Sequence, residues 1–516
     1  MFYSVLYPSK ELYEAPLVTE IPDYFKDLNL DQIVQTITKS RRESGLEPYY
    51  YTKIRDIDTI IYRQEIMKDI DSKDAYESIS IFASIIFNVQ RTVAGIKKYF
   101  KGSDSYYNNY LTKGRFLNAA ENYCSTINKM VLKTDIKMFK SVGLKNFWEY
   151  MRTYSQSENF ISLNDDIIKL REELSSVQYC MQIKDGNIYV RRYEQQEDHR
   201  MQIADIFEKF NEESAKDYTF KFIEEPYAEH VEAGVLNLVA RLNKDIFNDL
   251  NLFCKQYIEF VDDTIALFSK EIQFYLAYYE YMENLRKSNL QFCYPEICTS
   301  KEHIIIKNGF DLALASNILP EEVPVTNDYV LDSPEKIIVV TGPNQGGKTT
   351  YARAFGQIHH LGCIGCPIPG TEASLLLADN IYTHFPREED LTNLSGKLQD
   401  DLLRLREVLE RATDESIIIL NEIFSSTTLQ DAIMLGQRMM DSIEDIGSMA
   451  VLVTFIDELA TYSSITVSMV STVNKDDPSI RTYKIVRQKA DGLAYALHIA
   501  EKHGLTYEKL CRRLRL

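Results

Sequence analysis

One short segment limits the fold of this chain more than any other. It matches the pattern G-x-x-x-x-G-K-[ST] and reads Gly342-Pro343-Asn344-Gln345-Gly346-Gly347-Lys348-Thr349, followed by Thr350. The apolar run 337–340 precedes it and the helix-compatible run 350–360 follows. A strand, a glycine-rich loop and a helix in this order form a phosphate-binding loop, or P-loop, whose backbone N–H groups surround a phosphate. We therefore expect Lys348 to reach the β and γ phosphates of a nucleotide and Thr349 to offer its hydroxyl to Mg²⁺.

The sequence around the P-loop predicts an α/β domain that begins near residue 301. Short β-rich runs at 337–340, 417–420 and 450–454 are separated by glycine-bearing loops and helices. Runs that are apolar on both faces are typical of parallel strands covered by helices on both sides. The boundary between this domain and the preceding part of the chain is expected near residue 300.

Residues 1–300 are predicted to be helical. The stretch between Gly234 and Pro295 contains no glycine or proline, and its apolar residues from Leu242 to Met282 recur at helical spacing. At ~1.5 Å per residue, ~60 residues would span roughly 90 Å, so this stretch is either an arm or a helix that bends. Around Asp185, alternating apolar residues at 179–193 predict a β-hairpin.

Composition narrows the function classes. The chain has 516 residues and a formal charge of −18, so it is unsuited to coating nucleic acid over its whole surface, although a local basic track is compatible. Eight scattered cysteines and the absence of an apolar export segment predict a reduced, cytoplasmic protein. The longest apolar runs, such as 416–420, have the size of buried strands, so no membrane insertion is expected.

Two further segments carry candidate site residues. The strand 417–420 delivers Asn421-Glu422 at its end, where a P-loop ATPase places its acidic element, and Glu422 would polarise the attacking water. The alternative is a helix cap or turn, but the upstream P-loop favours catalysis. Ser395 opens an acidic helix and is either a plain N-cap or a serine that grips a γ-phosphate presented by another subunit.

These segments together resemble a known family. Residues 341–351 resemble the TGPNMGGKSTY loop of the MutS proteins, the ABC-class ATPases of DNA mismatch repair, and Pro-Asn inside the loop is the distinctive feature. Asn327-Asp328 resembles the family's N-D element near the adenine, and 421–431 resembles D-E-I-G-R-G-T-S-T-x-D. The run 452–454 is similar to the strand before the family's T-H switch.

The resemblance implies an architecture and a site. It implies a helical core and lever region (41–300) after an N-terminal segment (1–40), an ABC-class P-loop ATPase domain (301–488) and a helical dimerisation segment (489–516). It also implies ATP and Mg²⁺ as cofactors, with Asn327, Asp328 and the P-loop at the nucleotide. Thr349, Asn421 and Glu422 would hold the metal. Catalysis would fall to Glu422, Lys348 and, acting in trans, Ser395.

Three departures from the family pattern modify these expectations. Asn421 replaces the Mg²⁺-organising aspartate, so hydrolysis is expected to be slow, and Phe455 replaces the switch histidine. The chain also leaves no room for a mismatch-reading domain before its helical core. The expected function is a homodimeric, ATP-gated clamp or switch on mismatched, branched or irregular DNA, with protein partners in repair or recombination. The alternative is an ATP-binding scaffold without DNA binding. Whether 156–238 forms a DNA-contacting clamp is left open.

Other conspicuous residues are given structural interpretations. Cys363 and Cys366 have zinc-like spacing, but no second pair of matching spacing accompanies them. His359-His360 ends the helix after the P-loop, where helix-dipole effects favour histidine. The tyrosine-rich run 274–281 is expected to be the packed face of a long helix, with base stacking as the alternative.

Overall fold

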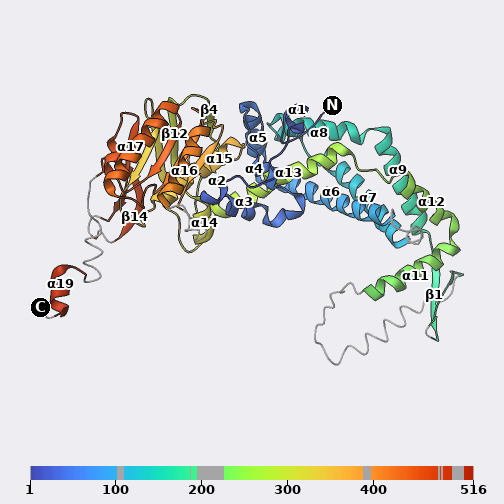
Figure 1. Cartoon of the computed structure of the whole chain (residues 1–516). Coiled ribbons are helices and arrows are strands. Elements are labelled where there is room, and N and C mark those ends of the chain that lie inside the picture. Colours follow the sequence, from blue (N-terminus) through green and yellow to red (C-terminus); the bar gives the residue numbers. More distant parts are fainter. Residues whose placement is uncertain are drawn as a thin grey trace. The chain divides into compact units, whose positions relative to one another are not determined.

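The computed structural model describes residues 2–100, 110–185, 187–194, 226–386, 397–474, 477, 480–490 and 505–514 (Figure 1). These residues divide into two compact units. Unit 1 comprises Met1–Tyr76, Phe139–Leu144 and Glu271–Leu516, and unit 2 comprises Glu77–Met138 and Lys145–Lys270. The domain limits expected at 40, 300 and 488 stay a prediction.

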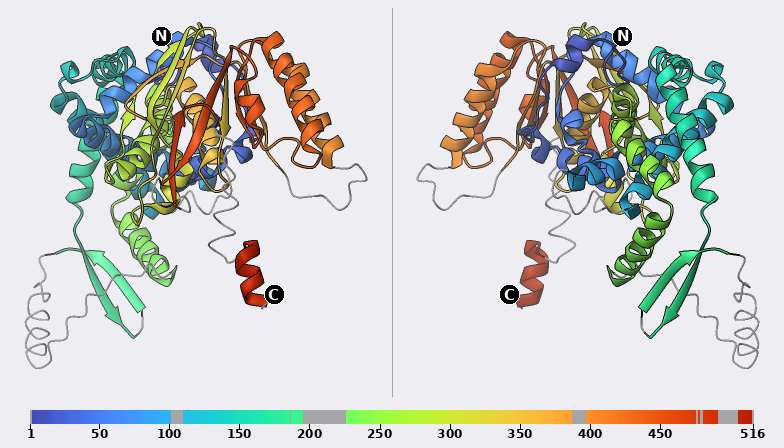
Figure 2. Two further views of the ribbon diagram at one scale, coloured as in Figure 1. Left: turned by 90° about the vertical axis from the view of Figure 1, so that its left-hand side faces the viewer. Right: turned by 90° about the vertical axis from the view of Figure 1, so that its right-hand side faces the viewer.

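A six-stranded sheet forms the centre of unit 1 (Figure 2). Its first five strands are parallel, and the sixth is antiparallel to its neighbour. In spatial order the strands are β10 (Ile381–His384), β11 (Ile417–Asn421), β12 (Met449–Val453), β7 (Ile337–Thr341), β13 (Thr466–Val473) and β14 (Arg481–Arg487). The three apolar runs recognised in the sequence are β7, β11 and β12, and all are buried, which confirms the parallel-strand prediction.

Helices pack onto this sheet because they have an apolar side. They are α15 (Lys348–Cys363), α16 (Lys397–Arg411), α17 (Leu429–Ile446) and the short η4 (Asp457–Thr461). On α17, Met439 and Ile443 are buried in a core that includes Ile418 of β11. Thr428 caps the start of α17 by accepting a hydrogen bond from the Asp431 N–H, and Gly447 ends the helix at φ 79°.

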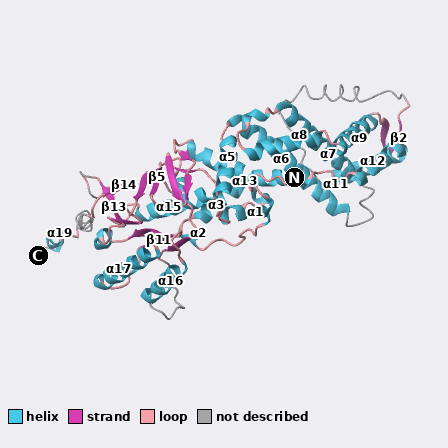
Figure 3. Ribbon diagram, turned by 90° about the horizontal axis from the view of Figure 1, so that it is seen from above, coloured by secondary structure: helices cyan, strands magenta, loops and turns pink. Residues whose placement is uncertain are grey.

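A second, four-stranded sheet of unit 1 lies in the order β4-β9-β5-β6. Its strands are β4 (Glu296–Cys298), β5 (His303–Gly309), β6 (Asn327–Asp332) and β9 (Glu372–Leu376). The short α14 (Leu312–Ile318) follows β5, and β3 (Phe292–Cys293) pairs with β8 (Ile368–Pro369). In the region the structure describes, β-strands are concentrated in unit 1 (Figure 3).

The N-terminal residues are built into unit 1. They form α1 (Lys10–Glu14), α2 (Tyr24–Asp27), α3 (Leu30–Thr38), η1 (Lys39–Ser44), α4 (Glu47–Tyr51) and α5 (Ile57–Ile70). Buried Arg63 of α5 donates hydrogen bonds to the carbonyls of Leu6 and Ile364, the latter at the end of α15. The hydroxyl of Ser4 donates to the buried carboxylate of Glu271 on α13 (Asp263–Arg286). These contacts tie the N-terminus to the helix that follows the P-loop.

Unit 2 is largely helical. Its helices are α6 (Lys73–Phe100), α7 (Tyr110–Lys133), η3 (Ile136–Met138), α8 (Val142–Ser155), α9 (Glu158–Ser175), α11 (Pro226–Leu242) and α12 (Lys244–Gln256). The first part of α13 and a two-stranded hairpin also belong to this unit. Stacked aromatic rings contribute to its core. The rings of Phe147 and Phe268 stack with centroids 3.6 Å apart, and Phe82 packs edge-on against both.

The long apolar stripe is not one straight helix. It is divided among three helices: α11 ends at Leu242, α12 ends at Gln256, and α13 begins at Asp263. The carboxylate of Asp262 accepts hydrogen bonds from the N–H groups of Thr264 and Ile265, so it starts a new helix. The stretch expected to be an arm or a bending helix is therefore made of separate helices.

The predicted hairpin is confirmed. Strands β1 (Tyr179–Lys184) and β2 (Asn187–Arg192) pair antiparallel, and Asp185 in the turn has φ 52°. The C-terminal helix α19 (Tyr507–Leu514) lies within the predicted dimerisation segment, while 491–504 lie outside the described residues.

One sequence-based expectation requires correction. The stretch Lys73–Lys98 within α6 has the length and apolar composition of a membrane-spanning helix, whereas the sequence was expected to contain no such stretch. It escapes a search for unbroken apolar runs because serine, asparagine and glutamine interrupt it. Helices in the core of globular proteins meet the same criteria, and Phe82 and Ile86 of this helix are fully buried. Composition alone therefore assigns no membrane role to α6.

Candidate functional site: a P-loop at one edge of the sheet

The segment 342–349 forms a tight loop between β7 and α15. Gly342 has φ 116° and Gly347 has φ 90°, conformations that side chains rarely tolerate. A Cβ atom at Gly346 would lie 2.3 Å from Oγ of Ser471, which itself donates a 2.6 Å hydrogen bond to the Gly346 carbonyl. The glycines are therefore required by the backbone and by the neighbouring strand β13.

Lys348 points into the loop at the start of α15. Its Nζ donates to the carbonyl oxygens of Gly342 at 2.8 Å and Pro343 at 3.0 Å. Burial lowers the pKa of Lys348, and the nearby carboxylate of Glu422 opposes this change. The ring of Phe455, which follows β12, lies 4.6 Å from Nζ, so the position expected to hold a switch residue contacts the P-loop lysine.

Two oxygen-bearing side chains meet at the carboxyl ends of β7 and β11. Oγ1 of Thr349 donates a 3.0 Å hydrogen bond to Oδ1 of buried Asn421. Glu422 follows with a left-handed φ of 52°, held by a hydrogen bond from its N–H to the Val453 carbonyl. Backbone strain of this kind costs about 1–3 kcal/mol and is concentrated at functional sites. Hydroxyl, amide and carboxylate oxygens are the ligand types that Mg²⁺ prefers.

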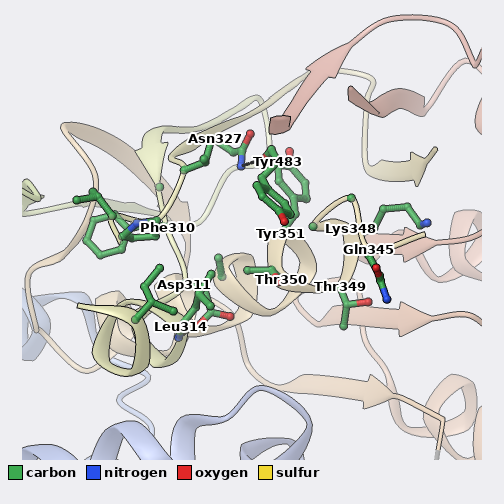
Figure 4. A pocket seen from close by; sticks show the side chains of 18 of the residues that line it. Phe310, Asp311, Leu314, Asn327, Gln345, Lys348, Thr349, Thr350, Tyr351 and Tyr483 are labelled. Atoms are coloured by element: carbon green, nitrogen blue, oxygen red, sulfur yellow. Dashed lines mark hydrogen bonds between the residues drawn. The ribbon is translucent and has the colours of Figure 1, made fainter. Parts of the chain in front are cut away.

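A cavity of about 390 Å³ adjoins the loop (Figure 4). The P-loop side of this cavity is lined by Gln345 to Tyr351 and by Glu422. The opposite wall comes from the turn before α14, from α14 and from the segment before β6. Its apolar residues are Phe310, Leu314, Ile318, Val323, Pro324 and Val325, and Asp311 and Glu322 lie among them. A cavity with phosphate-binding groups at one end and apolar groups at the other suits a purine nucleotide.

Asn327 and Asp328 have different surroundings. Asn327 lines the cavity, but its amide is engaged with β14, because Nδ2 donates to the Tyr483 carbonyl and Oδ1 accepts from the Ile485 N–H. The Asp328 carboxylate accepts a hydrogen bond from the Asn308 N–H, and Asp328 is not part of the cavity lining. Asn327 thus joins β6 to β14 beside the predicted site.

Tyr483 is a site residue that the sequence did not reveal. It lines the cavity and approaches Gly347, where an added Cβ would lie 3.7 Å from its ring. Its φ of 57° is left-handed although it lies inside β14. In the sequence it is one aromatic residue of a strand-like run, and no local signal connects it to a loop more than a hundred residues earlier.

The remaining P-loop residues are placed as follows. Thr350 lines the cavity, while Pro343 and Asn344 do not. The side chain of Arg481 donates to the Asn344 carbonyl at 3.2 Å, so β14 also supports the loop from outside. Ser395 lies outside the described residues, and its role stays a prediction.

The other conspicuous residues are structural. Cys363 and Cys366 are buried with raised thiol pKa values, and no cluster of three or more His, Cys, Asp or Glu that could hold a metal occurs among the residues described. Burial lowers the pKa of His359 to about 4 and that of His360 to about 3. Tyr275 and Tyr278 of α13 are fully buried, as expected for a packed face.

This architecture defines a class of protein. A buried parallel strand leads into a glycine-rich loop whose lysine and threonine face a cavity, and the polar residues Asn421 and Glu422 end a strand of the same sheet. These features define a P-loop nucleotide-binding protein.

Comparison with known families identifies the branch of this class. Residues 338–512 match the family MutS domain V, and residues 55–288 match the family MutS2 N-terminal domain. The two matches cover separate parts of the chain, one containing the P-loop and one containing most of the helical region. The chain is a member of the MutS family.

The individual relatives share 25–30% sequence identity with this chain over part of their length. The DNA mismatch repair protein MutS of Brevibacillus brevis is 30% identical over 217 residues, which are 41% of this chain and 25% of the relative. The protein of the same name from Chlorobium phaeobacteroides is 25% identical over 295 residues, 56% of this chain and 33% of the relative. The chain thus spans about a quarter to a third of the length of these relatives.

Proposed function

We propose that this protein is an ATP-dependent DNA-binding protein of the MutS type. In this proposal a dimeric ATPase acts as a clamp or switch that controls binding to mismatched, branched or otherwise irregular DNA. The observation that carries the proposal is that Lys348, Thr349 and Glu422 line one cavity in a member of this family, with Asn421 hydrogen-bonded to Thr349. Binding and hydrolysis of ATP would then be the input, and DNA contact the output.

Each site residue has a role in this proposal. The P-loop N–H groups and Lys348 bind the β and γ phosphates, which requires Lys348 to exchange its carbonyl partners for phosphate oxygens. Thr349 and Asn421 fit a Mg²⁺ ion, which would neutralise phosphate charge when bound. Glu422 orients the attacking water and accepts its proton. Because Asn421 is a neutral ligand, we expect weak metal binding and slow turnover.

The proposal includes a dimer with composite sites. In the MutS family a neighbouring subunit closes the nucleotide site at the γ-phosphate, and Ser395 is the candidate for that contact. A serine at a helix N-terminus combines a hydroxyl with the partial positive charge of the helix dipole, which favours an anion. Oligomerisation would therefore decide whether the bound nucleotide is hydrolysed.

The hairpin of unit 2 supports DNA contact. Arg192 donates to the Leu242 carbonyl of α11, so the face that carries Arg192 is turned toward α11. Because side chains alternate along a strand, Lys184, Tyr189 and Arg191 point to the opposite face, and all three are exposed. Cations beside an exposed aromatic ring suit the phosphates and bases of nucleic acid.

A second function class is favoured by one observation. The formal charge of −18 opposes DNA binding and suits an ATP-binding dimeric scaffold that acts on protein partners in repair or recombination. Salt-titrated binding to duplex, mismatched and branched DNA separates the two. A DNA-binding protein loses affinity steeply with salt, whereas a scaffold binds little DNA at any salt concentration.

A further inference from the structure

A groove in unit 2 is lined by cationic and uncharged side chains. It encloses about 500 Å³ and lies between α6 and α7, which are neighbours in Figures 1 and 3. The groove has two cationic lining residues, Arg115 and Lys129, and no acidic lining residue. The chain as a whole has 76 acidic and 58 basic residues, so the charge of this lining is opposite to that of the whole chain.

The wall formed by α7 is a regular polar stripe. Its residues are Arg115, Asn118, Asn122, Ser125 and Lys129. They recur at steps of three and four, so they lie on one face of the helix. At ~1.5 Å per residue the stripe is roughly 21 Å long, and DNA carries one phosphate per ~3.4 Å of each strand, so about six phosphates match its length.

The opposite wall and the floor complete the groove. Asn88 and Thr92 of α6 are exposed and line the other side, and buried Val89 and Ala119 lie beneath. Amide and hydroxyl side chains between two cations can donate hydrogen bonds to phosphate oxygens without adding charge. The helices that form the floor are held in place by packing, so the polar groups are presented on a rigid surface.

The surrounding charges are compatible with an anionic ligand. The guanidinium of Arg171 on α9 donates to Oδ1 of Asn118 and to Oε2 of Glu121. Glu121 lies on α7 beside the stripe, and the ion pair with Arg171 offsets its charge. Arg171 therefore neutralises the acid that lies beside the stripe, so that Glu121 does not oppose an anionic ligand.

We propose that this groove binds the sugar–phosphate backbone of DNA. The inference rests on the proposed DNA-binding function and assigns it a second contact surface, separate from the hairpin. An acidic protein segment would also be attracted by Arg115 and Lys129. The uncharged donors between them favour a phosphate backbone, because phosphates recur at short intervals while acidic side chains do not.

The test is a salt titration of DNA affinity with the full chain. A labelled duplex longer than the groove is bound by the unchanged protein, by Arg115→Ala/Lys129→Ala and by a control, Arg152→Ala/Lys255→Ala. The control removes two exposed cations of unit 2 that do not line the groove. Circular dichroism melting verifies that all three proteins fold.

The groove variant should bind DNA more weakly and with a smaller salt dependence. Loss of two phosphate contacts lowers the slope of log K against log salt by about 1.8, at about 0.9 per contact, and the control slope should stay unchanged. A second variant, Asn122→Asp, adds a carboxylate to the groove without removing a cation. It should also weaken DNA binding. Because it removes no side chain that packs in the groove, weaker binding by this variant cannot be explained by misfolding of the double variant.

The outcomes separate the two levels of the proposal. If the unchanged protein binds duplex but the double variant keeps the full salt slope, the groove assignment is overturned while DNA binding stands. If the unchanged protein binds no duplex at low salt, the DNA-binding part of the proposed function itself fails. Polyglutamate tests the alternative ligand. If the groove variant loses affinity for polyglutamate but keeps its affinity for DNA, the groove is a site for an acidic protein.

Discussion

Replacement of Glu271 by glutamine should change how the stability of unit 1 depends on pH. The Glu271 carboxylate is fully buried and accepts hydrogen bonds from the Ser4 hydroxyl at 2.8 and 2.9 Å and from the Val5 N–H at 2.8 Å. Burial raises its pKa to about 7, although these hydrogen bonds and the charge of Arg63 act in the opposite direction. Glutamine preserves the shape and a hydrogen-bonding oxygen but does not ionise.

The direction in which stability changes with pH follows from the number of protons bound by the folded and unfolded states. Between about pH 4.5 and 7 the folded protein holds a proton on Glu271 that the unfolded chain has lost, so rising pH lowers the free energy of unfolding. The loss is about 1.4 kcal/mol per pH unit, or about 3 kcal/mol over the whole interval. Above pH 7 both states are ionised and the loss stays constant. Glu271→Gln removes this dependence.

Urea unfolding followed by circular dichroism at pH 5 to 8 measures the effect. The stability of Glu271→Gln relative to the unchanged protein should increase by about 3 kcal/mol across this range. Exposed Glu321 provides the control, and Glu321→Gln should show no such increase. The single tryptophan, Trp148, lies in unit 2, so its fluorescence reports on the other unit. A difference that stays constant with pH would refute the assignment of a raised pKa to this carboxyl.

Three further predictions concern the P-loop site. Asn421→Asp should increase Mg²⁺ affinity by about tenfold or more and raise ATP turnover, because it adds a ligand charge beside Thr349, and an unchanged Mg²⁺ titration would show that other groups hold the metal. Gly346→Ala should weaken ATP binding, since its Cβ would displace the Ser471 hydroxyl from the Gly346 carbonyl, and full affinity in an equilibrium binding assay would contradict the loop geometry. Mixing Ser395→Ala chains with Lys348→Ala chains should restore ATP hydrolysis, because each mixed dimer would contain one intact composite site. If the subunits exchange but the activity equals the sum of the two parent proteins, Ser395 does not act in trans.

The sequence predicts the P-loop and its strands well because local rules determine them. The glycine pattern fixes the loop conformation, and uninterrupted apolar runs can be satisfied only as buried strands. The turn at Asp185 is predictable for the same reason. Asn421 and Thr349 are brought together by the parallel order of the sheet, which places the ends of β7 and β11 at the same edge.

Features that depend on distant contacts were not predictable. Tyr483 reaches the P-loop only through the pairing of β14 with β13 and the link to Asn327. The hydrogen bond between Ser4 and Glu271 joins residues separated by 267 positions, and no local sequence pattern around either residue predicts it. The stripe from Leu242 to Met282 keeps helical spacing through the interruption, so periodicity alone cannot show that Asp262 starts a new helix.

The central claim is that Lys348 binds the phosphates of ATP, and the affinity of Lys348→Ala for ATP tests it most directly. Equilibrium binding of a fluorescent ATP analogue should weaken by about tenfold to a hundredfold, since a hydrogen bond to a charged group contributes about 1.5–3 kcal/mol. Circular dichroism should stay unchanged, because the Lys348 ammonium contacts loop carbonyls and the Phe455 ring and not the apolar core. Unchanged ATP affinity and turnover in a folded Lys348→Ala protein would contradict the account.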